Sequence, residues 1–98
     1  MANYILSKKA SNDLGQIWYY TLETWSEEQA DRYFHDLIQS IDYIADNPDT
    51  AGRSYEEVRH DYRGFRSGRH IIFYRILKNG KVRIIRILHE RMDFGRHL

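Results

Sequence analysis

Apolar side chains recur every three or four residues through the first half of the chain. One apolar stripe runs from Leu14 to Trp25 and a second from Ala30 to Ala45, and this spacing predicts two amphipathic helices. Ser7 is placed to cap the first helix, while Ser26 opens a Ser-Glu-Glu-Gln capping box for the second. Asn47-Pro48 ends the second helix, because the residue before a proline avoids the α conformation. With almost no loop between them, the helices are expected to form an antiparallel hairpin.

The second half changes to strand-like runs separated by turn residues. A short strand is expected at residues 3–6, before the helices, and another at 58–62, after a loop at 49–57. Residues 63–68 contain two glycines and are interpreted as a connection, and residues 70–89 form a long hairpin. The predicted order is β-α-α-β-β-β. The sequence therefore predicts an α+β domain in which an antiparallel helical hairpin packs on one face of a mainly antiparallel β-sheet.

The long hairpin is centred on Asn79-Gly80, a dipeptide typical of a two-residue type I′ turn. Such a turn fixes the register of the strands and places Leu77 opposite Val82. One face of the hairpin then has the purer aliphatic centre, and we expect it to meet the helices. Its central side chains are Ile72, Tyr74, Ile85 and Ile87.

Charge is divided unevenly along the chain. Residues 1–50 hold three lysines or arginines against nine acidic residues, and residues 51–98 hold twelve against five, so the halves carry −6 and +7. Either an acidic helical layer lies beside a basic sheet, or the basic half binds an acidic protein or nucleic acid. In the predicted register Arg75 and Arg86 share one sheet face with Phe73. That face is either a solvated surface or a patch that binds an anion or a protein.

Several functional classes lack the residues they need. The chain has no cysteine, no apolar run near the roughly 20 residues that cross a bilayer, and no signal-peptide core, so a cytoplasmic location without membrane contact is expected. It has no helix-turn-helix pattern, so sequence-specific DNA binding by this chain alone is not expected. His70 and His89 are predicted to face each other. No third ligand has matching spacing, so a hydrogen-bonded pair is favoured over a metal site, and no cofactor is expected.

Motifs across nearly the whole chain together form a recognisable pattern. They lie at 6–33 (LSKKASNDLGQIWYYTLETWSEEQADRY), 47–48 (NP), 52–53 (GR), 62–63 (YR), 70–75 (HIIFYR) and 85–98 (IRILHERMDFGRHL). The last two stretches in combination are far more specific than any single short motif. On these residues the chain resembles the ParE toxins of the RelE/ParE superfamily of bacterial toxin–antitoxin modules.

The resemblance implies a single toxin domain over residues 1–98 that is held inactive by a ParD-like antitoxin encoded beside it. It further implies a non-enzymatic action, in which the toxin inhibits DNA gyrase and so blocks replication. The complex of the two proteins is expected to bind its operator through the antitoxin.

The resemblance also points to the last strand and the tail, roughly residues 86–98, as the part that carries toxicity. The residues expected to contact the target are Arg75, Arg86, Arg91, Met92, Asp93, Arg96, His97 and Leu98. Those expected to contact the antitoxin are Trp18, Trp25, Phe34, Leu37 and Phe73. For Trp18 and Trp25 the alternative is a place in the hydrophobic core.

A ribosome-dependent mRNA endonuclease, an activity also found in this superfamily, is the alternative function. RNA cleavage needs a general base, a cation and an acid. In many nuclease relatives an arginine stands where this chain has Ile71, and a His-Tyr pair or a functional tyrosine stands near Arg91-Met92. A substitute set would have to be drawn from Glu56, Glu57, Arg75, Arg86 and His89. A third possibility is a simple interaction module whose partner merely stabilises it.

Overall fold

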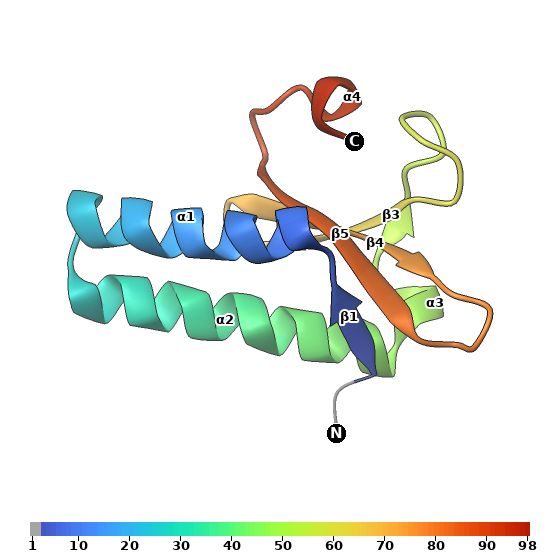
Figure 1. The fold of residues 1–98 in the computed structure, drawn as a ribbon, viewed down its shortest axis with the longest axis horizontal. Coiled ribbons are helices and arrows are strands. Elements are labelled where there is room, and N and C mark those ends of the chain that lie inside the picture. The colour runs from blue at the N-terminus through green and yellow to red at the C-terminus, as the bar shows by residue number, and fades with distance from the viewer. Residues whose placement is uncertain (1–2) are drawn as a thin grey trace.

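A computed structural model describes residues 3–98 and shows a helical hairpin, a five-stranded sheet and a short C-terminal helix (Figure 1). In chain order the elements are β1 (Tyr4–Leu6), α1 (Lys8–Thr24), α2 (Glu27–Asp46), α3 (Pro48–Ala51), β2 (Arg53–Ser54), β3 (Arg63–Ser67), β4 (His70–Ile76), β5 (Val82–His89) and α4 (Phe94–His97). The predicted α+β class is confirmed. No helix in the described range is long and apolar enough to cross a membrane.

Both long helices begin where the sequence predicts. The hydroxyls of Ser7 and Ser26 each accept a hydrogen bond from the amide three residues further on, at 3.0 and 3.1 Å. α2 ends at Asp46, as the following Asn-Pro pair predicts. Pro48 then begins α3, because its fixed φ suits the first turn of a helix. The expected loop at 49–57 is therefore wrong in part, since it contains α3 and β2.

The strands lie in the order β1-β5-β4-β3-β2; β1 pairs with β5 in parallel and the other pairs are antiparallel. β3 occupies residues that the sequence pattern assigned to a connection, whereas the strand expected at 58–62 is a series of turns. Gly64 explains this error. A Cβ at Gly64 would lie 2.5 Å from the ring of Tyr55, so this glycine permits close packing inside a strand and does not interrupt it.

The turn of the β4–β5 hairpin differs from the predicted type I′ turn. The Gly80 amide donates to the Leu77 carbonyl at 2.9 Å, and the Leu77 amide donates to the Lys81 carbonyl at 2.8 Å. Gly80 has a φ of 84°, but Asn79 does not have the positive φ that a type I′ turn would require. The loop is thus a three-residue turn with glycine in the left-handed position. Ile76, and not Leu77, pairs with Val82.

A second irregularity restores the predicted register at the open end of the hairpin. Tyr74 pairs with Ile84 and Phe73 with Arg86, so Ile85 is an extra residue, a β-bulge. Val82 and Ile84 therefore face the helices, and Ile85 packs on the other side. Ile72, Tyr74 and Ile87 meet the helices as expected.

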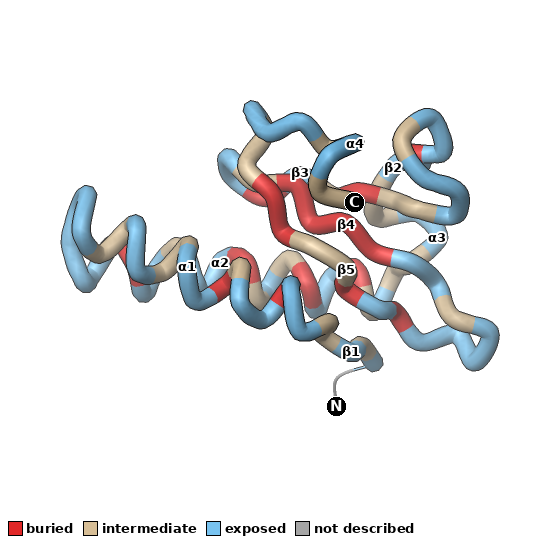
Figure 2. Tube along the Cα trace, turned by 45° about the horizontal axis from the view of Figure 1, so that its top comes forward, coloured by how far each residue is buried: buried red, intermediate tan, exposed pale blue. Residues whose placement is uncertain are grey.

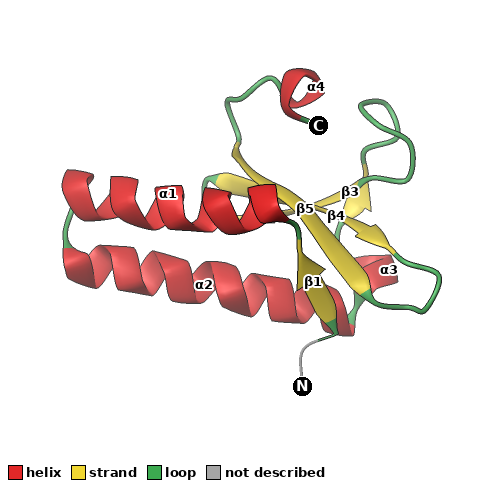
Figure 3. Cartoon of the chain, in the orientation of Figure 1, coloured by secondary structure: helices red, strands yellow, loops and turns green. Residues whose placement is uncertain are grey.

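The sheet separates two apolar clusters, which Figure 2 shows as buried strands between the helices and the tail. The larger cluster, on the helical side, is built from Ala10, Leu14, Leu37, Ile41, Ile44, Ile72, Tyr74, Val82, Ile84 and Ile87. The smaller, on the opposite face, is built from Tyr55, Ile71, Phe73 and Leu88. The helical hairpin projects beyond the strands (Figure 3). Trp25 lies at its projecting end and is 70% exposed, so its alternative place in the core is wrong.

Candidate functional site

A groove of about 610 Å³ lies between α1, the start of α2 and the end of β5. Tyr20, Trp25 and Met92 contribute exposed apolar surface to it, and Tyr20 and Trp25 are 69% and 70% exposed. Arg69, His70 and His89 line its polar part. Two large aromatic rings so close together on a surface mark a site for a partner more often than isolated exposed residues do.

One wall of the groove is the edge of β5, which β1 covers only as far as Ile84. Beyond that point α1 supplies the hydrogen bonds. The Ser7 hydroxyl donates to the Ile85 carbonyl at 2.7 Å, and Asp13 Oδ2 accepts from the Ile87 amide at 3.0 Å. Beyond Ile84, the side chains of Ser7 and Asp13 therefore form the hydrogen bonds to the β5 backbone that a neighbouring strand would otherwise form. These bonds fix α1 against the end of β5.

Arg86 forms a two-pronged ion pair with Asp13, at 2.8 and 2.9 Å, and also donates to the His97 carbonyl at 3.2 Å. The hydrogen bonds that Arg86 donates to the Asp13 carboxylate raise the pKa of Arg86 despite its partial burial. The two side chains are only 17% and 12% exposed. The expectation that Arg86 is a surface charge for the target is corrected, because this guanidinium joins α1, β5 and the tail.

A tyrosine–histidine network lies in the polar part of the groove. The Tyr33 hydroxyl is 2.7 Å from His70 Nδ1 and accepts a hydrogen bond from the Arg69 amide at 3.0 Å. His70 and His89 lie opposite each other on β4 and β5 as predicted. Their rings meet edge to face, with centroids 5.4 Å apart and an angle of 84°, and within residues 3–98 the hydrogen bonds of the two rings go to Tyr33 and to the Arg91 amide and not to each other. Burial, helped by the neighbouring His89, lowers the pKa of His70 to about 4.

Beside this network, Glu90 accepts hydrogen bonds from two arginines. Arg66 contacts one carboxylate oxygen of Glu90, and Arg69 contacts the other at 3.4 Å. Partial burial alone would raise the pKa of Glu90, but the two guanidiniums lower it overall. Of these three residues Arg69 lines the groove, so its polar part has a cation that shares its one carboxylate partner with a second arginine.

The C-terminal tail folds back on the sheet. Asp93 caps α4 by accepting a hydrogen bond from the Gly95 amide at 3.1 Å. The Phe94 ring packs edge-to-face on Phe73 at 4.9 Å and on Tyr55 at 6.0 Å. Arg59 donates to the Leu98 carbonyl. The tail therefore covers the smaller apolar cluster.

The residues expected to contact the antitoxin do not form one surface. Trp25 lies in the groove, while Phe34 is exposed outside it and Trp18 donates its indole N–H to Asp31 at 3.0 Å. Leu37 and Phe73 are fully buried, so their assignment to a partner surface is corrected. Sequence reasoning missed Tyr20 and Tyr33. Tyr20 lies outside the predicted apolar stripe of α1. An aromatic residue in that position is expected on the surface, and this could have indicated a role in binding.

The residues expected to contact the target lie in two places. The Arg75 side chain is exposed on β4. In the tail, Arg91, Met92, Asp93 and Arg96 are exposed, whereas His97 and Leu98 are half-buried. Met92 belongs to both the tail and the groove.

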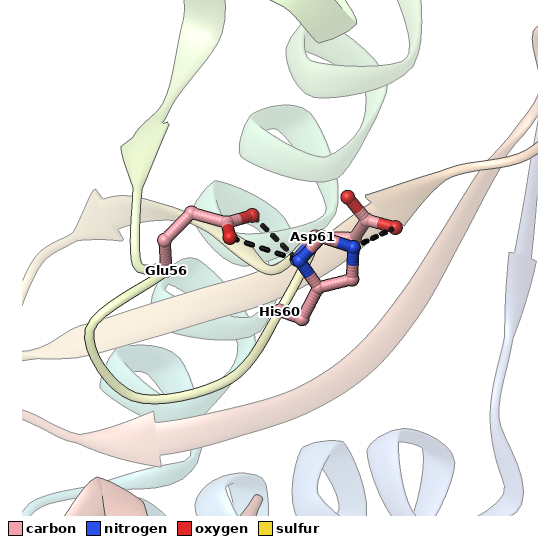
Figure 4. Close-up of side chains that lie close together, drawn as sticks. All are labelled: Glu56, His60 and Asp61. Carbon is pink, nitrogen blue, oxygen red and sulfur yellow. Dashed lines mark hydrogen bonds and ion pairs between the residues drawn. The ribbon is translucent and has the colours of Figure 1, made fainter.

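A cluster of Glu56, His60 and Asp61 lies on the loop before β3 (Figure 4). His60 Nδ1 is 3.0 Å from Glu56, and His60 Nε2 is 3.4 Å from Asp61. The two carboxylates thus pair with different nitrogens of the ring, and one possible ligand atom from each of the three residues lies within 4.8 Å of the others. Glu56 raises the pKa of His60, and the Asp61 amide and His60 lower that of Glu56. These contacts hold the two ends of the loop together. They also occupy Glu56, which is one of the residues considered for RNA cleavage.

In that set, three of the five groups have another partner: Glu56 pairs with His60, Glu57 with Arg53 at 3.2 Å, and Arg86 with Asp13. His89 lines the groove, and Arg75 is exposed on β4. Both carboxylates and one of the two cations that RNA cleavage would use are therefore engaged by other residues.

Comparisons with known proteins agree with one another. The sequence model of the family described as "ParE toxin of type II toxin-antitoxin system, parDE" matches residues 4–94. Toxin ParE1 of Mycobacterium tuberculosis is 39% identical over 97 residues, which cover 99% of this chain and 98% of that protein. Toxin ParE1 of Caulobacter vibrioides is 41% identical over 98 residues, covering 100% and 99%. A chain from the solved structure of a chromosomal ParDE TA system from P. aeruginosa shares the fold, with a TM-score of 0.79 at 21% identity, covering 91% of this chain and 96% of that one.

Proposed function

Because the chain belongs to the ParE toxin family, the toxin component of parDE type II toxin–antitoxin systems, we propose that a ParD-like antitoxin neutralises it by occupying the groove. We further propose that its target is DNA gyrase and that it acts by binding, without an enzymatic step. The P. aeruginosa chain of the same fold comes from a ParDE system, which supports an antitoxin partner for this chain.

The exposed aromatic pair in the groove is the observation that carries the first proposal. Tyr20 lies near the end of α1 and Trp25 directly after it, and the rest of the described chain leaves both side chains largely exposed. Covering about 100 Å² of apolar surface on each ring would contribute roughly 2–3 kcal/mol per ring to binding. A second hollow on the outer side of α1 shares Gln16 and Tyr20 with the groove. A partner segment that leaves the groove can therefore continue over α1.

Replacing the aromatic pair tests this assignment. We expect Trp25→Ala or Tyr20→Ala to weaken binding of the antitoxin about 10- to 100-fold, as at the centre of a protein interface. Calorimetric titration of the purified toxin with its antitoxin measures the change. Tyr43→Ala is the matched control, because Tyr43 is an exposed tyrosine of α2 outside the groove. If the two groove variants bind the antitoxin as tightly as the wild type does, the groove is not part of the antitoxin interface.

The proposal for the target rests on the exposed cations of the tail and of β4. Arg91 and Arg96 have exposed side chains on a segment that Phe94 and Arg86 hold in place. Arginine suits a protein or phosphate partner because its planar fork donates two parallel hydrogen bonds. Gyrase inhibition is supported by membership of the ParE family. The scattered partners of Glu56, Glu57 and Arg86 favour a binding mechanism over RNA cleavage.

A further inference from the structure

The polar end of the groove is lined by Arg69, whose carboxylate partner also pairs with a second arginine. Arg66 and Arg69 share Glu90, and each contacts a different oxygen of that carboxylate. The Glu90 side chain is 20% exposed, whereas the side chains of Arg66 and Arg69 are 62% and 70% exposed. A guanidinium has five N–H donors, so most donors of both arginines remain available to a second acceptor.

The imidazole of His89 adds a further donor beside Arg69. The Arg91 amide donates to Nδ1 of His89 at 3.2 Å, so the proton of the neutral His89 ring lies on Nε2. The His70 ring, which contacts the Tyr33 hydroxyl through Nδ1, lines the groove together with His89. This end thus combines one strong cationic donor with one weaker donor.

The acidic groups near this end already have partners. Asp13 is paired with Arg86 and with the Ile87 amide, and Glu90 is held by its two arginines. The remainder of the groove is apolar at Tyr20 and Trp25. An occupant complementary to both ends needs apolar side chains at one end and a negative charge at the other.

We propose that Arg69, with His70 and His89, forms a carboxylate-binding subsite that accepts an acidic side chain of the antitoxin. The occupant of the groove is an amphipathic antitoxin segment whose apolar residues cover Trp25 while its aspartate or glutamate pairs with Arg69. This inference rests on the proposed function of the groove. An apolar wall and one excess charge fit a mixed apolar and acidic peptide better than a nucleic acid backbone, which is neutralised by many cations.

Charge reversal at Arg69 tests the subsite. We expect Arg69→Glu to weaken antitoxin binding at least tenfold in calorimetry, and Arg69→Ala to weaken it about threefold. The matched control is Arg83→Glu, which reverses an exposed arginine of β5 outside the groove and should change affinity less than about twofold. Because Arg69 is largely exposed, the thermal unfolding of the variants should match that of the wild type. An antitoxin in which one acidic residue is changed to arginine should restore the binding of Arg69→Glu.

The outcomes separate this inference from the proposed function. One outcome is that the antitoxin binds the wild type, that Trp25→Ala lowers the affinity, and that Arg69→Glu does not. In that case the subsite is wrong and the assignment of the groove to the antitoxin stands. If the antitoxin does not bind the wild type, both are wrong. If Arg69→Glu leaves antitoxin affinity unchanged but abolishes binding of a single-stranded RNA oligonucleotide, the subsite takes phosphate, and the inference is overturned.

Discussion

At the scale of single residues, Asp13 and Arg86 show what one sequence conceals. Asp13 stands among the polar residues of a helix, and Arg86 among the charges of a strand, 73 residues later. Their contact depends on the bulge at Ile85 and on the early end of β1, both of which are tertiary features. Arg86 was therefore predicted as a surface charge. The pairing of His70 with His89 was predicted correctly because the bulge at Ile85 offsets the longer turn and restores the predicted register at the open end of the hairpin.

The pH dependence of stability tests the environment of His70. Its pKa is about 4 in the folded protein and 6.5 without these neighbours, so the unfolded chain binds the proton more readily. The contribution is fully present above pH 6.5 and is lost as the pH falls toward 4. We expect the free energy of unfolding to drop by about 1–2 kcal/mol between about pH 7 and pH 4.5, after allowance for the partly exposed ring.

Urea denaturation at the two pH values measures this drop, with His70→Gln as the comparison. The variant cannot take up the proton, so its stability should fall less than that of the wild type over the same interval. Parallel losses in the two proteins would show that His70 is not the responsible group.

At the scale of elements, the two long helices were predictable because periodicity and caps agree at each end. The strands were less so. Glycine suggested a break at β3, yet Gly64 makes room for Tyr55, and Gly68, with a φ of 60°, lies beneath the ring of Tyr33. The groove could not be predicted from the sequence. It depends on how far the helical hairpin projects beyond the sheet, and no local pattern specifies that length.

The tail is the element on which toxicity is proposed to depend. We expect the double variant Arg91→Ala/Arg96→Ala to lower toxicity at least tenfold while antitoxin affinity stays within about threefold, since each exposed arginine of a binding site contributes about 1 kcal/mol or more. Colony counts after induction measure toxicity. Lys78→Ala/Lys81→Ala is the matched control, because it removes two exposed cations from the hairpin turn.

Point variants are preferable to deleting residues 90–98. Deletion would remove Phe94 from the cluster around Phe73 and so confuse lost binding with lost stability. The role of the tail would be contradicted if the Arg91→Ala/Arg96→Ala variant is as toxic as the wild type. It would also be contradicted if the Lys78→Ala/Lys81→Ala variant loses as much toxicity as the arginine variant.

At the scale of the whole molecule, the two proposed interfaces lie on different parts of the fold. The groove lies against α1, and the tail covers the opposite face of the sheet, with Met92 between them. Among the ion pairs of residues 3–98, Asp13–Arg86 alone joins the acidic first half to the basic second half. Internal complementarity therefore neutralises little of the basic charge. Most of that charge remains available to an acidic partner.

Inhibition of gyrase by binding is tested most directly by a DNA supercoiling assay with the purified toxin, run beside an in vitro translation reaction. The expected result is loss of supercoiling or trapped cleaved DNA, reversal by the antitoxin, and normal translation. Blocked translation with fully active gyrase would contradict the gyrase proposal, and would turn attention to an RNA-cleaving site on this fold.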